Sequence, residues 1–228
     1  PSAKYDAEGT SGIINIVLKK EKKKGTNGSF TVNTGIPNNH SVGLSLNHRR
    51  EKLNIFTQLG AGRRTFLTNS IGESINRTPS YSRLTNEGLD EKNETFINVL
   101  LGADVHFNKY NTLSVSGHFA YEWEDQYSKT NYQLLDYNQS TTGRMSRTDT
   151  TIATNPKWQY DIRYTKEFKS GKDHQLIISA IGSYFGKDKT SSYDNVDASG
   201  TLSNLRQRSG ADFKEGEYLF QADYSRPI

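Results

Sequence analysis

The chain has 228 residues, a net charge of +4 and no cysteine, which excludes disulfides, thiol catalysis and zinc sites built on cysteine. Only 32% of its residues are hydrophobic, a low fraction that alone would indicate disorder. Its 13 tyrosines, 10 phenylalanines and 2 tryptophans indicate folded structure instead, because disordered chains are poor in aromatic residues. The length suits one large β domain or two small ones.

A short apolar run between glycines is the first distinctive segment. Residues 13–18 read Ile-Ile-Asn-Ile-Val-Leu, which is too short for a membrane-spanning helix of roughly 20 residues. Their β-branched side chains predict a strand that is buried on both faces. Five lysines follow within residues 19–24. Such a block can contact nucleic acid or anionic lipid headgroups, although a solvated linker is the more common role.

From Gly28 onward the dominant pattern is strict alternation of apolar and polar residues, which predicts strands with one apolar face. The clearest stripe runs from Ile97 to Phe107. In the stripe at 176–184, Ile177 and Phe185 offer a competing odd-numbered face. Eight such stripes follow the lysine block, at residues 30–36, 42–46, 53–61, 97–107, 113–123, 158–164, 176–184 and 218–224.

The connections between these stripes are of two kinds. Short polar turns are expected at 48–54, 107–112 and 168–174, with a further tight turn at 36–40. Long loops rich in Ser, Thr, Asn, Asp and Gly are expected at about 72–92, 130–155 and 190–212.

Pairing across the tight turns tests whether the stripes share a face. Placing Leu46 opposite Ile55, Phe107 opposite Leu113 and Ile36 opposite Val42 aligns apolar residues with apolar residues in all three hairpins. A slip of one residue would reverse the faces of a strand, so this agreement predicts a single apolar face.

Strand length separates two antiparallel architectures. A soluble sandwich has strands of about 5–6 residues, whereas several stripes here approach the roughly 9–11 residues that cross a membrane at a tilt. Loops that are short at one end and long at the other are typical of outer-membrane barrels. Aromatic residues at stripe ends, such as Trp123 and Trp158, fit interfacial girdles, with ordinary cross-strand aromatic pairs as the alternative.

Residues 1–20 resemble the last segment of the plug domain in TonB-dependent outer-membrane receptors, closest to the outer-membrane β-barrel family of Bacteroidetes-type bacteria. The resemblance is carried by Pro1, Ser2, Tyr5, Gly9, Gly12, Ile13, Ile14, Asn15 and Ile16. It implies a barrel of about 22 strands closed by an N-terminal plug. This chain would be a fragment, with the end of the plug domain and a linker at 1–24 and the N-terminal portion of the β-barrel at 25–228. The expected fold is therefore an all-β antiparallel meander of about eight long strands from a transmembrane β-barrel, preceded by one plug-type strand.

The same resemblance implies a function. The chain would belong to a bacterial outer-membrane receptor that binds an extracellular nutrient and imports it with energy from the TonB complex, which would contact parts absent from this chain. The other partners would be outer-membrane lipid and an unknown extracellular ligand. The long loops would hold that ligand, because binding residues concentrate on loops carried by a rigid scaffold. The alternatives are a porin-like passive or structural barrel, which needs no plug strand, and a soluble β-sandwich adhesin, which needs no lipid-facing band.

No motif in the chain carries enzymatic chemistry, so we expect no catalytic residue, no cofactor and no metal, and the ligand-binding residues stay unknown. The histidines at 40, 48, 106, 118 and 174 lack metal-site spacing, and His106 and His118 are expected on the polar face, opposite Ser114 and Gly102. The glycines of 60–64 lack the strand-to-helix context of a phosphate loop.

Two charged patterns have ordinary explanations. The acidic clusters at 90–94 and 122–125 could bind cations, but solvated loop charge is the more common role. The arginine pairs at 49–50 and 63–64 stand among acidic residues, so nucleic-acid binding is not expected.

Eight strands cut from a larger barrel would leave two unpaired edges. Free edges invite pairing with another chain. We therefore expect the fragment either to curl into a smaller closed barrel or to associate with itself through its strand edges.

Overall fold

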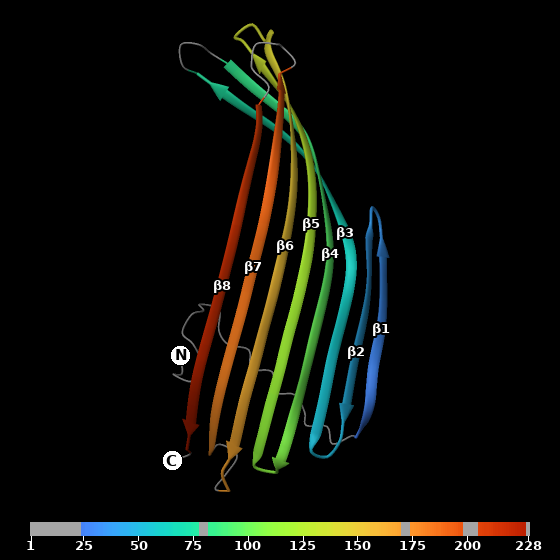
Figure 1. The fold of residues 1–228 in the computed structure, drawn as a ribbon, viewed down its shortest axis with the longest axis vertical. Helices are drawn as coiled ribbons and strands as arrows, with labels where there is room; N and C mark the ends of the chain where they lie inside the picture. Colours follow the sequence, from blue (N-terminus) through green and yellow to red (C-terminus); the bar gives the residue numbers. More distant parts are fainter. Residues whose placement is uncertain (1–23, 78–81, 170–173, 198–204, 227–228) are drawn as a thin grey trace.

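The computed structural model describes residues 24–77, 82–169, 174–197 and 205–226. These residues form one eight-stranded antiparallel sheet, in which each strand pairs with the next along the chain (Figure 1). The strands are β1 (Gly25–Gly35), β2 (Asn39–Arg49), β3 (Leu53–Asn76), β4 (Ser82–Asn108), β5 (Asn111–Leu135), β6 (Thr141–Glu167), β7 (Gln175–Asp197) and β8 (Leu205–Ser225). The predicted all-β meander is confirmed. The predicted plug-type strand at 13–18 lies outside the described residues.

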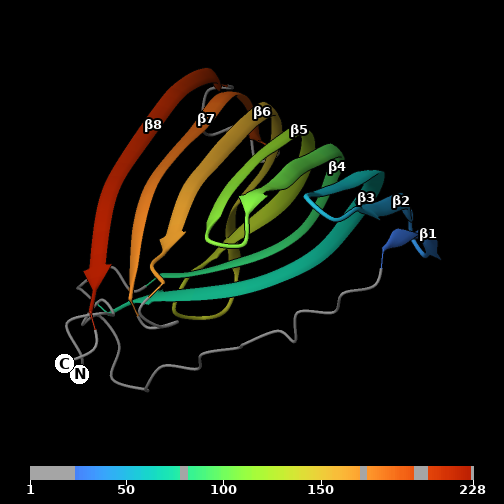
Figure 2. The same cartoon turned by 90° about the horizontal axis from the view of Figure 1, so that it is seen from below.

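The sheet is strongly curved and open (Figure 2). Seen along the strands, it forms an arc with β1 at one end and β8 at the other, so it has a convex and a concave face. Among the described residues, β1 pairs only with β2 and β8 only with β7. Curling into a smaller closed barrel, one of the two expected outcomes, is therefore not observed, and association through the edges stays a prediction.

The apolar stripes of all eight strands share the convex face, as predicted. In an antiparallel pair, directly opposite residues point to the same side of the sheet, so the register shows which residues form one row. One row crosses six strands through Leu44, Leu59, Val99, Phe119, Trp158 and Tyr184. In β7 the even-numbered residues continue the convex face, because Ile178 lies opposite Tyr164, and the competing Ile177 and Phe185 belong to the concave face.

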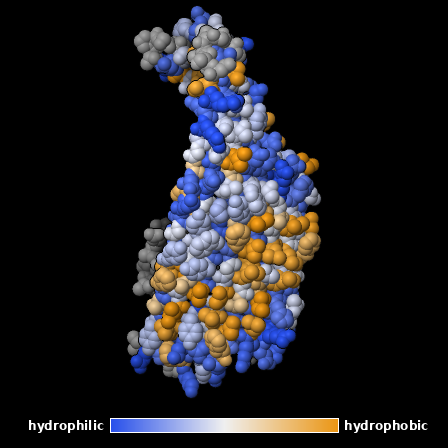
Figure 3. All heavy atoms as spheres, in the orientation of Figure 1, coloured by the Kyte–Doolittle hydropathy of each residue, from blue (hydrophilic) through white to orange (hydrophobic). Residues whose placement is uncertain are grey.

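Five successive rows of this kind make an apolar band on the convex face (Figure 3). Most of its large side chains are exposed although they are apolar; Leu101, for example, is 56% exposed and Phe220 is 76% exposed. We use the name apolar band for the following convex-face residues: Val42, Leu44, Leu46, Ile55, Leu59, Ile97, Val99, Leu101, Val105, Leu113, Val115, Phe119, Ile162, Ile178 and Phe220.

The predicted pairings across the tight turns were wrong by two or four residues, although their faces were right. Leu46 lies opposite Thr57 rather than Ile55. Leu113 lies opposite Val105 rather than Phe107, because a bulge between His106 and Asn108 changes the register next to the turn. Val42 likewise lies opposite Val32 rather than Ile36. Alternation determines only the face, and a shift by an even number of residues leaves the faces unchanged.

The predicted short turns are confirmed at 36–38, 50–52 and 109–110, whereas the one at 168–174 lies partly outside the described residues. The predicted long loops were wrong. Strands β3 to β8 continue through most of the polar stretches: β3 ends at Asn76 and β4 begins at Ser82, β5 ends at Leu135 and β6 begins at Thr141, and β7 ends at Asp197 and β8 begins at Leu205. Polar residues form strands there because antiparallel partners satisfy the backbone, while water can solvate both faces. Three long hairpins therefore project beyond the apolar band, and the upper parts of β3 and β4 sweep beneath the arc (Figure 2).

Candidate functional site

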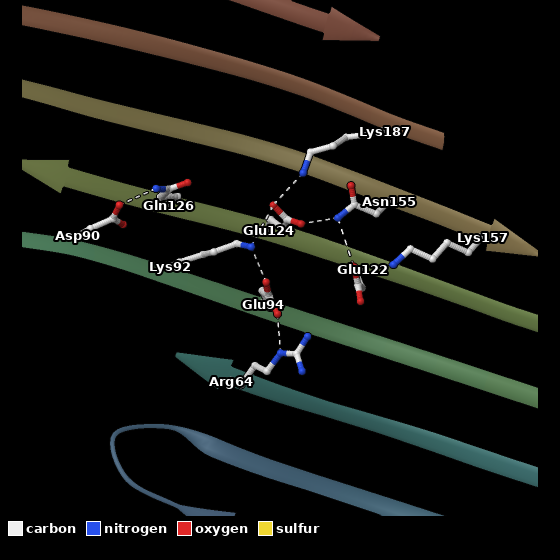
Figure 4. A network of polar contacts seen from close by, with 10 residues as sticks. All are labelled: Arg64, Asp90, Lys92, Glu94, Glu122, Glu124, Gln126, Asn155, Lys157 and Lys187. Atoms are coloured by element: carbon white, nitrogen blue, oxygen red, sulfur yellow. Dashed lines mark hydrogen bonds and ion pairs between the residues drawn. The ribbon is translucent and has the colours of Figure 1, made fainter. Parts of the chain in front are cut away.

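A network of charged side chains crosses the concave face from β3 to β7 (Figure 4). Its centre lies just beyond the apolar band, on the side of the long hairpins, because Glu94 stands three residues before Ile97, where the band begins in β4. Its members are even-numbered in β3, β4 and β5 and odd-numbered in β6 and β7, which places them on the concave face. The residues drawn are Arg64, Asp90, Lys92, Glu94, Glu122, Glu124, Gln126, Asn155, Lys157 and Lys187.

Two carboxylates form the centre of this concave-face network. Glu94 of β4 and Glu124 of β5 lie directly opposite each other, with side chains only 7% and 10% exposed. Lys92 Nζ lies 2.5 Å from Glu94 Oε1 and 3.6 Å from Glu124 Oε2, so it bridges the two. Arg64 Nε donates to Glu94 Oε2 at 2.5 Å, and Lys187 Nζ lies 3.6 Å from Glu124 Oε2. Two like charges that would repel are thus held between three cations.

The surroundings keep Glu94 and Lys92 charged. Burial raises the pKa of Glu94, but hydrogen bonds from Lys92 and Arg64 outweigh it and leave the pKa below its usual value. Burial lowers the pKa of Lys92, but its hydrogen bond to Glu94 and the charge of Glu124 outweigh it and leave the pKa raised. Both residues lie outside the segments that carry the apolar band. Because both pKa values move away from neutrality, this pair acts as fixed charges rather than as a proton donor and acceptor.

Asn155 joins the centre of the network to a second branch. Its side chain is almost fully buried, at 3% exposure. Its Nδ2 donates to Glu122 Oε2 at 3.3 Å and to an oxygen of Glu124, while Lys157 Nζ lies 3.4 Å from Glu122. Asn155 Oδ1 is buried and has no hydrogen-bond partner among the described residues. The amide therefore ties two neighbouring carboxylates of β5 to β6.

Aromatic rings support the cations on the same face. The guanidinium carbon of Arg64 lies 5.4 Å from the ring centre of Phe66 and 5.3 Å from that of Phe96. Lys157 Nζ lies 5.5 Å from the ring centre of Phe185. The quadrupole of an aromatic ring attracts such cations, and the contact fixes their position. The network is thus an ordered, charge-balanced polar wall, in which the cations of Figure 4 equal its carboxylates in number.

The structure brings together two predicted clusters that were expected in separate loops. The acidic stretches 90–94 and 122–125 belong to strands β4 and β5 and lie side by side, so their role as solvated loop charge was wrong. Lys157 and Lys187 were not singled out, because only the register shows that they reach Glu122 and Glu124. One signal in the sequence could have indicated that these charged residues share a face: the alternation of side chains between two faces continues beyond the apolar stripes.

The histidines behave as separate polar residues. His106 and His118 are on the concave face as predicted, but they lie opposite Thr112 and Leu100 rather than Ser114 and Gly102. His106 Nδ1 lies 2.9 Å from Thr112 Oγ1. Within the described ranges, no group of three or more His, Asp or Glu side chains could hold a metal ion. The glycines of 60–64 are part of strand β3.

No helix in the described part of the chain is long and apolar enough to cross a membrane. Comparison with models of known protein families finds no match, and comparison with curated proteins finds none either. Any statement about function therefore depends on the geometry and on the sequence itself.

Proposed function

We propose that this chain forms part of the wall of a transmembrane β-barrel, and that the barrel belongs to a TonB-dependent receptor that imports an extracellular nutrient across the bacterial outer membrane. The transmembrane location is supported above all by the contrast between the two faces of one curved sheet. The convex face exposes the apolar band, whereas the concave face holds the charged network (Figures 3 and 4). A barrel in lipid needs this arrangement, with an apolar outside and a polar lumen.

The height of the apolar band supports this proposal. In β4 the band extends from Ile97 to Val105, with alternate residues facing outward. At about 3.3 Å per residue this stretch covers roughly 25–30 Å, before any tilt is allowed for. The lipid-facing band of an outer-membrane barrel is about 25 Å tall. Residues 82–96 of the same strand would then project into water.

Aromatic clusters at both borders of the band also support it. Toward the long hairpins, Trp158 stacks with Tyr184 at a ring-centre distance of 5.7 Å, and Tyr121 contacts Trp123 at 4.5 Å. Toward the short turns, Phe168 contacts Tyr224 edge to face at 6.2 Å. Tryptophan and tyrosine favour the membrane–water interface, because one end of the side chain is apolar and the other is polar.

The rival functions differ in what they require of these residues. A soluble β-sandwich adhesin would cover the apolar band with a second sheet, and the described residues form a single sheet. A porin-like barrel would have the same wall but would need no plug strand. The resemblance of residues 1–20 to the end of a plug is the only feature that favours a receptor over a passive barrel, and these residues lie outside the described ranges. No ligand contact is assigned.

Fractionation of the producing bacterium tests the proposal in two steps. The full-length protein is expected in the outer-membrane fraction after carbonate extraction, and its recovery as a soluble protein would contradict the membrane location. Growth on a panel of nutrients is then compared between a strain without the gene and a strain without TonB. A nutrient that requires both supports the receptor, whereas one that requires the barrel but not TonB supports a passive barrel.

A further inference from the structure

The turn end of the sheet carries a basic pocket at the β2–β3 turn. The pocket has a volume of about 630 Å³. Its lining contains four cationic side chains and one carboxylate, so with a neutral histidine it carries a charge of +3. We call it the turn-end basic pocket, and it is lined by Lys24, Gly25, His48, Arg49, Arg50, Glu51, Lys52 and Leu53.

This pocket borders the apolar band directly. Thr26 lies opposite His48, two residues along each strand from the pair Gly28 and Leu46. Thr26 and His48 therefore lie on the convex face, one row closer to the turn than Leu46. His48 in turn lies opposite Ile55 of β3. Leu46 is 41% exposed and Ile55 is 46% exposed. The cationic groups therefore begin where the apolar surface ends.

Hydrogen bonds hold Arg50 toward this border. Arg50 Nε donates to His48 Nε2 at 3.2 Å, and because arginine has only donors, His48 Nε2 must be the acceptor. The proton of the neutral ring is then on Nδ1, which donates to Thr26 Oγ1 at 2.7 Å. Lys24 pairs with Glu51, whereas Arg50 has no carboxylate partner among the described residues. The terminal nitrogens of Arg50 are thus left for an anion.

We propose that the turn-end basic pocket binds the phosphate of an anionic lipid headgroup, with Arg50 as the principal contact. A guanidinium matches a phosphate group with two parallel hydrogen bonds, and neighbouring basic residues add attraction to an anionic membrane surface. The acyl chains of the same lipid would lie along Leu46 and Ile55. This inference depends on the membrane location proposed above. Inorganic phosphate shares the recognised chemistry, and the experiment separates the two sources.

The test uses the full-length protein in nanodiscs of phosphatidylcholine with a minor fraction of phosphatidylglycerol. Native mass spectrometry after release into detergent measures how many phosphatidylglycerol molecules stay bound. Wild type is expected to retain phosphatidylglycerol in preference to phosphatidylcholine. Arg50→Ala should lower this retention about tenfold, as expected when one bidentate charged contact is lost. Arg50→Lys, which keeps the charge but loses the planar fork, should fall between the two.

Arg63→Ala is the matched control. Arg63 lies on the convex face of β3, opposite His40 and Thr95, at the other border of the apolar band. The control removes the same charge from the same face but leaves the turn-end basic pocket intact, so retention should not change. Heat-modifiable migration on gels verifies that each variant is folded.

Three results would overturn the proposal. Equal retention by wild type and Arg50→Ala would show that Arg50 does not contact the lipid. An equal loss in Arg63→Ala would show that any convex-face arginine has the same effect. Full displacement of phosphatidylglycerol by millimolar inorganic phosphate would assign the pocket to the free anion. Failure of the wild-type protein to enter nanodiscs would instead contradict the proposed membrane location.

Discussion

Glu94 and Glu124 face each other across β4 and β5, and Lys92 Nζ lies between them, 2.5 Å from one carboxylate and 3.6 Å from the other. Direct opposition of like charges destabilises a strand pair. In this pair the two carboxylates are also nearly buried, which strengthens their repulsion. The bridging lysine is therefore the residue on which this part of the concave-face network depends.

Replacing Lys92 with Gln should lower the free energy of unfolding by about 2 kcal/mol, because the two carboxylates then face each other with less compensation. The figure lies below that for a fully buried pair, since Lys92 is 33% exposed. Urea unfolding of the folded protein in detergent measures the change. The double variant Lys92→Gln/Glu124→Gln should recover most of the loss, because it removes one of the two opposed charges. An unchanged midpoint for Lys92→Gln would contradict the bridging role.

Acid should weaken the network through Glu94. Its pKa in the folded protein is lower than the usual 4.5, so the unfolded state binds the proton more tightly. The contribution of Glu94 to stability is therefore complete above the usual carboxyl pKa and is lost as the pH falls through the lower, folded value. Urea midpoints measured from about pH 7 down to about pH 3 should fall more steeply in wild type than in Glu94→Gln. Parallel curves for the two proteins would contradict the lowered pKa.

Features that depend on a single strand could be predicted from the sequence, whereas features that depend on the pairing between strands could not. The stripe from Ile97 to Phe107 predicted its own face correctly, because alternation is local to one strand. Residues 82–92 were interpreted as part of a loop, because Ser, Asn, Asp and Gly occur there, although a partner strand on each side makes them strand. The contact between Glu94 and Glu124 joins residues 30 positions apart, and it depends on a register that alternation leaves open.

If the convex face contacts lipid, an added charge should prevent folding on that face and be tolerated on the concave face. Leu101 lies within the apolar band and is 56% exposed, so Leu101→Arg would place a charge in the hydrocarbon. Such a change costs about 2–4 kcal/mol near the middle of the bilayer. Ser116 of the neighbouring strand lies opposite Gly102 on the concave face at nearly the same height, and Ser116→Arg should be tolerated. The fraction of each variant that migrates as a folded barrel on unheated gels measures the difference.

If the convex face does not contact lipid, the two variants should be equally affected. A loss of assembly in Ser116→Arg alone would place lipid on the concave side, contrary to the proposal.

Two glycines beside Tyr160 should differ in their tolerance of a methyl group. Gly117 of β5 and Gly182 of β7 both lie opposite Tyr160, one on each side. A Cβ added at Gly182 would lie 2.4 Å from ring atoms of Tyr160, so the ring covers this glycine. A Cβ added at Gly117 would meet its nearest neighbour, the carbonyl oxygen of Gln159, at an ordinary 3.9 Å.

Gly182→Ala should therefore lower the free energy of unfolding by about 1–3 kcal/mol, since either the ring of Tyr160 or the backbone must move. Gly117→Ala should leave the free energy of unfolding nearly unchanged. It is the matched control, because it is the same substitution in the same row of the sheet. Urea unfolding in detergent, followed by tryptophan fluorescence, compares them, because Trp158 stacks near Tyr160 at a ring-centre distance of 6.1 Å. The double variant Gly182→Ala/Tyr160→Ala should show little further loss from the methyl group, as the ring that it meets is gone. A similar penalty for Gly182→Ala with and without Tyr160 would mean that the glycine is required by the backbone rather than by the ring.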